Sequence, residues 1–187
     1  MGDLLSKKVA IVTGSGRGIG RGIALKFAEE GASVVVNDLG GSTDGSSQST
    51  PPADEVVGEI IAAGGSAVAN YDSVASMEGG ENIVQTAIDS FGRLDIVVTP
   101  AGILRDRMIF NMTEPEWDDV IAVHLKGTFT VVKHACILFR QQRSGCIITF
   151  SSVSGLYGNS GQANYGAAKD GIAGFTRGVA RDMGRYG

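Results

Sequence analysis

Short runs of β-branched and other apolar residues alternate along this chain with longer segments in which apolar residues recur at helical spacing. The first run, VAIVT, ends in a glycine-rich turn, and the five runs cover residues 9–13, 32–38, 66–71, 94–99 and 146–151. Continuous apolar runs of this length predict strands that are buried on both faces, as in a parallel sheet.

Between these runs, the apolar spacing predicts a helix from the glycine-rich turn to residue 30, and further helices over residues 53–63, 77–91, 114–142 and 162–185. Residues 39–52 are rich in Gly, Ser and Thr and end in two prolines, which predicts a loop. Strands that alternate with helices predict right-handed crossovers over both faces of one sheet. We therefore predict an α/β fold, a doubly wound parallel sheet of five strands, built as a single domain by residues 1–187.

Two of the predicted helices carry apolar or small residues on more than one side. The helix over 114–142 has a stripe formed by Trp117, Ile121, Leu125, Phe129, Val132 and Cys136, with further valines elsewhere on its circumference. The last helix has small residues at 163, 167, 171, 174 and 178, which allow close backbone approach. We predict that these helices associate with a second copy in a homodimer or homotetramer. The alternative is that both faces pack within one subunit.

Composition excludes several classes of partner. The chain is 43% hydrophobic and 19% charged, as in ordinary globular proteins, and its formal net charge of −4 offers no attraction for nucleic acid or an anionic membrane. No run approaches the ~20 apolar residues of a membrane span, and residues 1–10 are too polar for a signal peptide. We expect a cytoplasmic protein that binds neither nucleic acid nor membrane.

The soft metal ligands are few. Cys136 and Cys146 form neither a disulfide framework nor a metal motif, and His124 and His134 complete the set. We predict no metal site, and free thiols fit a reducing compartment.

The glycine-rich turn after the first run has the chemistry of a phosphate cradle. Its glycines, Gly14, Gly18 and Gly20, follow the spacing G-x-x-x-G-x-G rather than G-x-G-x-x-G. A tight turn without β-carbons lets backbone N–H groups and a helix N-terminus approach a pyrophosphate. The predicted contacts to a dinucleotide are Gly14, Ser15, Arg17, Gly18, Ile19 and Gly20. Methyltransferases that bind S-adenosylmethionine carry a similar turn, so the turn alone leaves both readings open.

Asp38 ends the second run, 18 residues after Gly20. An acid at this position can accept hydrogen bonds from the ribose hydroxyls of an adenosine, and its charge repels a 2′-phosphate. Asp38 therefore favours NAD over NADP, although a guanidinium at Arg17 could pair with that phosphate. The alternative reading of Asp38 is a solvated turn residue.

Near the C-terminus, Ser152, Tyr165 and Lys169 form a possible proton-transfer cluster. Tyr165 and Lys169 are four residues apart, so both project from one face of a helix. Half-ionising a phenol near pH 7 takes roughly 4 kcal/mol, and an ammonium ~5 Å away at an effective dielectric of ~20 supplies about 3 kcal/mol. The spacing thus suffices for a tyrosine general acid/base, with Ser152 as a hydrogen-bond partner of the substrate oxygen. The alternative is that both side chains merely line a helix surface.

These residues together resemble the short-chain dehydrogenase/reductase family. Residues 13–20 are similar to its T-G-x-x-x-G-x-G cofactor motif, and Ser152 precedes Tyr165-Gly-Ala-Ala-Lys169 by the family's spacing. The resemblance implies a Rossmann-like fold in which the tyrosine is the acid/base, the lysine lowers the tyrosine pKa and holds the nicotinamide ribose, and the serine steadies the substrate. It also places Asp72, Ser73, Ala101 and Gly102 at the cofactor, with Asp72 against the adenine.

Within the family, four stretches are most similar to (3R)-hydroxyacyl-CoA dehydrogenase domains of multifunctional enzymes. They cover residues 36–41, 69–74, 101–107 and 158–165. This similarity implies a 3-hydroxyacyl thioester substrate, although none of the stretches reads an acyl chain directly.

Three features depart from the family pattern. Pro100 replaces an asparagine and removes a backbone donor beside the cofactor. His124 replaces the asparagine of the proton relay, so we weigh a catalytic role for it against a packing role. The family also continues beyond Gly187 with two strands and a substrate lid, which implies a shortened form whose fifth strand is an open edge.

The leading hypothesis is an NAD(P)-dependent oxidoreductase that acts on a small secondary alcohol or its ketone. A non-catalytic dinucleotide-binding protein is the alternative.

Overall fold

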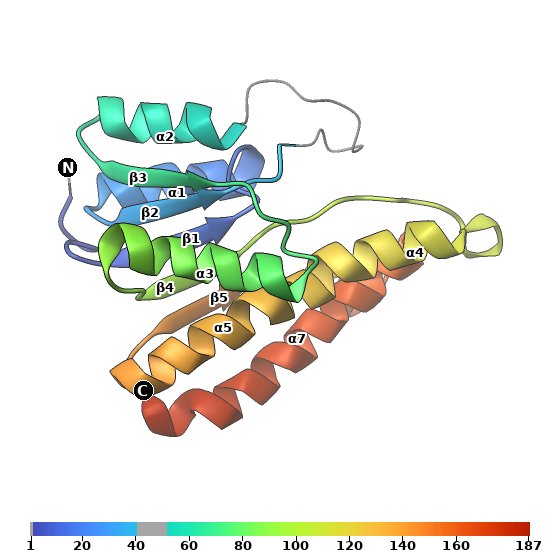
Figure 1. Ribbon diagram of the computed structural model, residues 1–187. Coiled ribbons are helices and arrows are strands. Elements are labelled where there is room, and N and C mark those ends of the chain that lie inside the picture. Colours follow the sequence, from blue (N-terminus) through green and yellow to red (C-terminus); the bar gives the residue numbers. More distant parts are fainter. Residues whose placement is uncertain (1, 41–51) are drawn as a thin grey trace.

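The computed structural model describes residues 2–40 and 52–187, which form one parallel sheet with helices on both faces (Figure 1). The strand order is β3-β2-β1-β4-β5. The strands are β1 (Val9–Thr13), β2 (Ser33–Asn37), β3 (Ser66–Asn70), β4 (Ile96–Thr99) and β5 (Cys146–Thr149), and all neighbours pair in parallel. The predicted doubly wound α/β fold is confirmed.

The helices divide between the two faces of the sheet. They are α1 (Gly18–Glu29), α2 (Pro52–Ala62), α3 (Met77–Phe91), α4 (Glu114–Ile121), α5 (Gly127–Gln142), α6 (Val153–Tyr157) and α7 (Ala163–Met183). Helices α1 and α2 cover one face of the sheet, and α3 and α5 cover the other (Figure 1). Helix α7 lies beside α5 and also contacts β5.

Each central strand feeds both cores because successive side chains point to opposite faces. Along β1, Ala10 and Val12 pack with α1 and α2, while Val9 and Ile11 pack with α3 and α5. All five residues of β1 are buried, which explains its continuous apolar run.

The region predicted as one helix over 114–142 contains an irregularity. Between α4 and α5, residues Ala122–Lys126 form a π-helical turn. A π turn within an α-helix often marks a functional site. The apolar stripe predicted along this region is unevenly buried, since Val132 is 1% exposed and Phe129 is 41% exposed.

Other differences from the predictions are local. The five-residue helix α6 was not predicted, and it begins at a Ser152 cap. The last helix ends at Met183 and continues as a 3₁₀ turn over Gly184–Tyr186. Most of the predicted loop, residues 41–51, lies outside the described residues, and Pro52 already belongs to α2.

The helical stretch Glu114–Gln142 is long and apolar enough, by length and composition, to cross a membrane. This is weak evidence because a core helix passes the same test, and 44% of its most apolar window is buried in the fold. The sequence prediction had found no such stretch.

Asp95 joins the start of β4 to β1. Its carboxylate accepts the N–H of Val9 at 2.9 Å and pairs with the guanidinium of Arg93 at 2.6 Å. Burial disfavours its charge, but the bonds from Arg93 and Val9 outweigh that cost and hold the pKa of Asp95 below its ordinary value. This carboxylate therefore ties the first strand to one formed more than 80 residues later.

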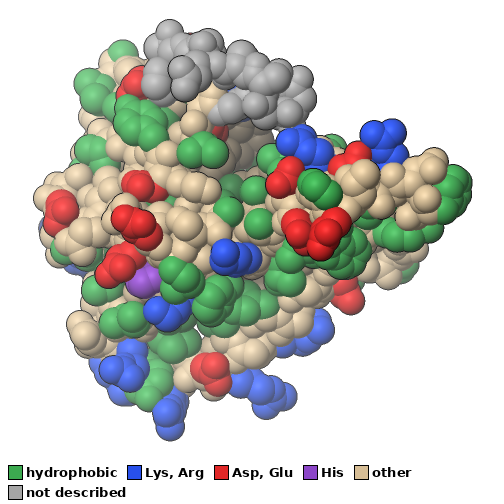
Figure 2. All heavy atoms as spheres, turned by 45° about the vertical axis from the view of Figure 1, so that its right-hand side comes forward, with side chains coloured by type: hydrophobic (Ala, Val, Ile, Leu, Met, Phe, Trp, Pro, Cys, Tyr) green, Lys and Arg blue, Asp and Glu red, His purple; other side chains and the backbone are tan. Residues whose placement is uncertain are grey.

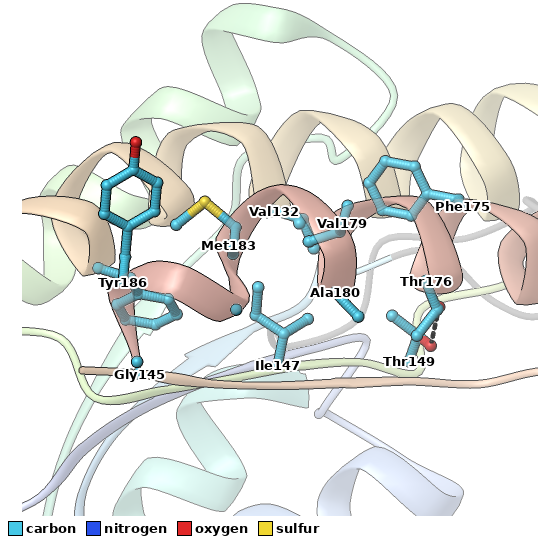
Figure 3. A pocket seen from close by; sticks show the side chains of 13 residues that line it. Val132, Gly145, Ile147, Thr149, Phe175, Thr176, Val179, Ala180, Met183 and Tyr186 are labelled. Atoms are coloured by element: carbon cyan, nitrogen blue, oxygen red, sulfur yellow. Dashed lines mark hydrogen bonds between the residues drawn. The ribbon is translucent and has the colours of Figure 1, made fainter. Parts of the chain in front are cut away.

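Strand β5 is an edge of the described sheet, as the sequence predicted. Beside it, an apolar cleft of about 300 Å³ lies between β5 and α7 (Figure 3). Ile147, Val179 and Met183 line the cleft, and the hydroxyls of Thr149 and Thr176 form a 2.7 Å hydrogen bond across one end.

Candidate active site

The glycine-rich turn joins β1 to α1, and its backbone accounts for the glycines. Gly14 and Gly18 have φ values of +56° and +54°, which side chains disfavour. A Cβ on Gly14 would lie 2.6 Å from the Cα of Ala101, and a Cβ on Gly20 would lie 2.3 Å from the carbonyl oxygen of Gly14. Only glycine fits these close approaches.

Helix α1 begins in this turn without a side-chain cap. The side chain of its N-cap residue, Arg17, makes no capping hydrogen bond, and no other residue within 2–40 and 52–187 caps the first N–H groups of α1 through its side chain, so an anion fits there. Ile19 is exposed beside them, whereas Ser15 is buried and donates its hydroxyl to the carbonyl of Val12 at 2.6 Å. Ser15 thus braces the turn through its side chain, and the turn itself fits a pyrophosphate.

Asp38 lies against the same turn. One carboxylate oxygen accepts the N–H of Gly16 and the other accepts the N–H of Gly40, both at 2.9 Å. These bonds fix a negative charge beside the phosphate cradle. Arg17, from the same turn, is exposed.

Asp72 and Ser73 follow β3 at the same edge of the sheet. Asp72 accepts hydrogen bonds from the amides of Asn70 and Asn82, at 2.8 and 3.0 Å. The hydroxyl of Ser73 accepts the N–H of Ala75 at 3.3 Å. Both residues are partly exposed, as a contact to a bound nucleoside requires.

The segment after β4 keeps its place despite Pro100. The N–H of Ala101 is 3.3 Å from the hydroxyl of Thr13 in β1. A Cβ on Gly102 would lie 2.1 Å from the imidazole of His124, so glycine is required there as well. Pro100 and Gly102 both border the cleft described next.

A cleft of about 510 Å³ opens where these segments meet α7. Its lining combines polar groups with apolar walls: Ile19, Pro100, Gly102, Ile103, Leu104, Arg105, His124, Phe150, Ser151, Tyr165 and Lys169. The topology therefore brings Tyr165, Lys169 and His124 into one cleft with Ile19, which follows the glycine turn.

Tyr165 and Lys169 lie close together in this cleft, as their spacing on α7 predicts. The ammonium of Lys169 lies 5.6 Å from the centroid of the Tyr165 ring and donates to the carbonyl of Phe150 at 2.8 Å. Lys169 is 4% exposed, and burial lowers its pKa to about 8. Most of these amines are therefore still charged at pH 7. The Tyr165 hydroxyl makes no hydrogen bond within the described part of the chain.

Two neighbouring serines differ in what their hydroxyls can do. Ser151 lines the cleft but donates its hydroxyl to the carbonyl of Lys169 at 2.9 Å. Ser152 caps α6 and accepts the N–H of Ser154 at 3.2 Å. Its proton has no acceptor among residues 2–40 and 52–187, but Ser152 is not among the residues that line the cleft, so its predicted contact with the substrate stays a prediction.

His124 sits in the π turn and touches both sides of the cleft. Its Nε2 lies 2.8 Å from the carbonyl oxygen and 3.1 Å from the nitrogen of Ile103, and its ring packs edge-on against Tyr165, with centroids 5.1 Å apart. Burial is the main reason that its pKa falls to about 4, so the imidazole is neutral at pH 7. His124 packs against Tyr165 and also borders the cleft, so the catalytic role and the packing role both stay predictions.

Sequence reasoning missed Asn164, which holds Tyr165 in place. Its buried amide donates to the carbonyls of Arg105 and Glu116, and its oxygen accepts the N–H of Tyr165 at 2.8 Å. The only signal was an asparagine at the start of a helix, where polar caps are common.

The sequence also leads us to expect no metal site. Within the described ranges, no three His, Cys, Asp or Glu side chains gather closely enough to hold a metal ion. Both cysteines are free thiols.

The arrangement of turn, acid and tyrosine–lysine pair matches a known family. A family model described as short chain dehydrogenase matches residues 8–187. The chain belongs to this family. It is 54% identical to the peroxisomal multifunctional enzyme A of Dictyostelium discoideum over 94% of its own length, which is 39% of that protein. It is 43% identical to a 3-oxoacyl-[acyl-carrier-protein] reductase of Synechocystis over 98% of its length, which is 71% of the reductase.

Solved structures agree with this assignment. A short chain dehydrogenase from Mycobacterium avium superposes with a TM-score of 0.91 at 51% identity, over 98% of this chain and 65% of that one. The chain thus spans only part of the length of these relatives.

Proposed function

We propose that this short-chain dehydrogenase is an NAD-dependent oxidoreductase that interconverts a secondary alcohol and its ketone. The observation that carries the proposal is the buried Lys169 ammonium, 5.6 Å from the Tyr165 ring, in a cleft that ends at the glycine turn. A bound nicotinamide supplies the hydride acceptor. The glycine turn and the uncapped start of α1 fit its pyrophosphate.

The residues of the chain manage the proton. During alcohol oxidation, the Tyr165 oxygen takes the hydroxyl proton as the C–H bond breaks and its electron pair leaves as hydride. The Lys169 ammonium stabilises the phenolate by about 3 kcal/mol at an effective dielectric of ~20. The Ser152 hydroxyl donates to the substrate oxygen and orients it.

The substrate class follows from the walls of the cleft and from the relatives. Ile103 and Leu104 give one wall an apolar lining, which suits an acyl chain. The Synechocystis relative is named for a 3-oxoacyl group. We therefore infer a 3-hydroxyacyl or 3-oxoacyl thioester as substrate.

The proposal is tested by titrating the protein with NADH while the NADH fluorescence is followed. NAD⁺ reduction is then assayed with a 3-hydroxybutyryl thioester as substrate. We expect both binding and turnover. Binding without turnover on any secondary alcohol would favour a non-catalytic dinucleotide-binding protein. Absence of binding to NADH and NADPH would overturn the proposal entirely.

Lys169→Met is expected to lower kcat by one to two orders of magnitude at pH 7, because the phenolate loses its neighbouring charge. The pKa of about 8 makes this effect pH-dependent. Above pH 8 the wild-type amine is itself neutral, so the ratio of the two kcat values should shrink. Profiles of kcat from pH 6 to 10 measure this ratio. Lys133→Met, at an exposed lysine, is the control. A ratio that stays constant across this range would contradict the role.

Asp38→Ser is expected to lower the preference for NAD over NADP by about ten- to a hundredfold. The substitution removes a charge that repels a 2′-phosphate and an acceptor for the ribose hydroxyls. The ratio of kcat/KM values for the two cofactors measures the effect. An unchanged ratio would mean that Asp38 only braces Gly16 and Gly40.

We infer a homodimer or homotetramer that uses α5 and α7. Phe129 and Phe175 pack edge-to-face between these helices, with centroids 6.3 Å apart, yet Phe129 keeps 41% of its surface exposed. A Cβ on Gly178 would meet nothing within 4 Å, so this part of α7 has room for another backbone.

Gly178→Glu is expected to raise the dimer dissociation constant at least a hundredfold, because a symmetric interface would bring two carboxylates together. Gly178→Ala, the matched control, should leave association intact. Sedimentation velocity measures both, and a Glu variant that associates like the wild type would exclude this face.

A further inference from the structure

Two buried amides face each other at the carboxyl edge of the sheet. Asn37 ends β2 and Asn70 ends β3, and they are direct partners in the strand register. They are 2% and 6% exposed. The Asn37 amide donates to the side-chain oxygen of Asn70 at 2.8 Å and to the carbonyl of Asp72 at 2.9 Å.

Asn70 in turn forms hydrogen bonds with Asp72. Its amide nitrogen donates to one carboxylate oxygen of Asp72 at 2.8 Å and to the hydroxyl of Thr86, in α3, at 2.9 Å. Its side-chain oxygen also accepts the N–H of Asp72 at 3.0 Å. The second carboxylate oxygen of Asp72 accepts the amide of Asn82, also in α3, at 3.0 Å. Side chains from two elements thus fix both oxygens.

The main chains of the same two asparagines hold the rest of the edge. The carbonyl of Asn37 accepts the N–H of Ser15 in the glycine turn at 2.9 Å, and the carbonyl of Asn70 accepts the N–H of Asp38 at 3.0 Å. The amide pair therefore connects the turn, Asp38 and Asp72, the three parts of the chain that would contact the adenosine and pyrophosphate of a dinucleotide.

Sheet stability does not require amides at these positions. The preceding residues of β2 are Val34, Val35 and Val36, all fully buried, and a further apolar pair would be buried without polar cost. The amide pair is compatible with burial because its N–H groups are hydrogen-bonded, and each of the two amides donates one of these bonds to Asp72. Each oxygen of Asp72 keeps a lone pair, since a carboxylate has about four acceptor sites.

We propose that Asn37 and Asn70, together with Asn82, are positioning residues that aim the Asp72 carboxylate at the exocyclic amine of the cofactor's adenine. This inference rests on the proposed dinucleotide function. It assigns base selectivity to a network that itself makes no contact with the base. A purine with an oxygen in place of the amine offers Asp72 an acceptor instead of a donor, so the oriented carboxylate rejects it.

The test compares NAD⁺ with nicotinamide hypoxanthine dinucleotide, whose base carries that oxygen. The wild type is expected to bind NAD⁺ about tenfold more tightly than the hypoxanthine analogue, as the two Kd values from calorimetry measure. Asn70→Ala and Asn82→Ala should reduce this preference in Kd to about twofold. Asn82 is exposed, so its variant should fold normally even if the buried Asn70→Ala does not. Gln85→Ala, at another exposed amide on α3, is the matched control and should keep the wild-type preference.

The outcomes separate this inference from the function beneath it. A wild type that uses both dinucleotides equally, or an Asn82→Ala variant that keeps the full preference while Asp72→Ala loses it, would overturn the positioning role alone. A wild type that binds neither dinucleotide would overturn the proposed function and this inference with it.

Discussion

Tyr165→Phe is expected to lower kcat by on the order of 10³-fold or more while changing NADH affinity by no more than about twofold. The substitution removes one oxygen from a ring that otherwise keeps its packing against His124 and the Lys169 ammonium. General acid–base groups contribute about 10²–10⁴ in rate, and a phenylalanine ring has no oxygen that could take the proton. Steady-state kinetics with a 3-hydroxyacyl thioester and NADH titration together measure the two quantities.

Tyr157→Phe is the matched control for this prediction. Tyr157 ends α6 and is 86% exposed, so its variant should retain wild-type kcat. A Tyr165→Phe enzyme with more than a tenth of the wild-type kcat would show that another group moves the proton.

His124 is expected to cost the folded protein about 3 kcal/mol as the pH falls from 6.5 to 4. Burial lowers the pKa of His124 from 6.5 to about 4. Between pH 6.5 and 4, the imidazole binds a proton in the unfolded chain but not in the folded chain. The stability of the folded protein is therefore fully present above pH 6.5 and is lost as the pH falls toward 4. A difference of about 2.5 pKa units corresponds to about 3 kcal/mol. Urea unfolding at a series of pH values measures the slope.

The comparison with His124→Gln isolates this contribution, because the carboxylates titrate in both proteins. The groups facing the imidazole are Tyr165 and Lys169, and neither is changed by the substitution. The variant should lose less stability between pH 6.5 and 4 than the wild type. Equal losses would mean that the imidazole is protonated in the folded state.

The parts of the fold that depend on long apolar patterns were predicted well. Strand β1 has the predicted bounds, β2 is one residue shorter than predicted at each end, and β3 is one residue shorter at its C-terminal end. The π turn at Ala122–Lys126 could not be predicted, because the apolar spacing around His124 is the same for an α-helix. Helix α6 was missed because five residues are too few for a periodic signal.

The site was predicted where residue chemistry was specific and missed where burial decided the role. Tyr165 and Lys169 were found because helical spacing alone places them on one face. Asn37 and Asn70 were not, since asparagine at the end of an apolar run usually indicates a turn. The Ser151 hydroxyl donates to the carbonyl of Lys169, whereas the Ser152 hydroxyl accepts the N–H of Ser154, and no pattern in the sequence distinguishes the two.

The central place of β1 affects how fast this protein reaches its native state. Strand β1 pairs with β2 on one side and with β4 on the other. The second neighbour comes much later in the chain: Asp95, which accepts the N–H of Val9, follows it by 86 residues. Closing so long a loop costs entropy before any pairing repays it, and non-local parallel pairing is slow for this reason. Until β4 pairs with it, one edge of β1 has no partner strand, and unpaired apolar edges are prone to pair with other chains.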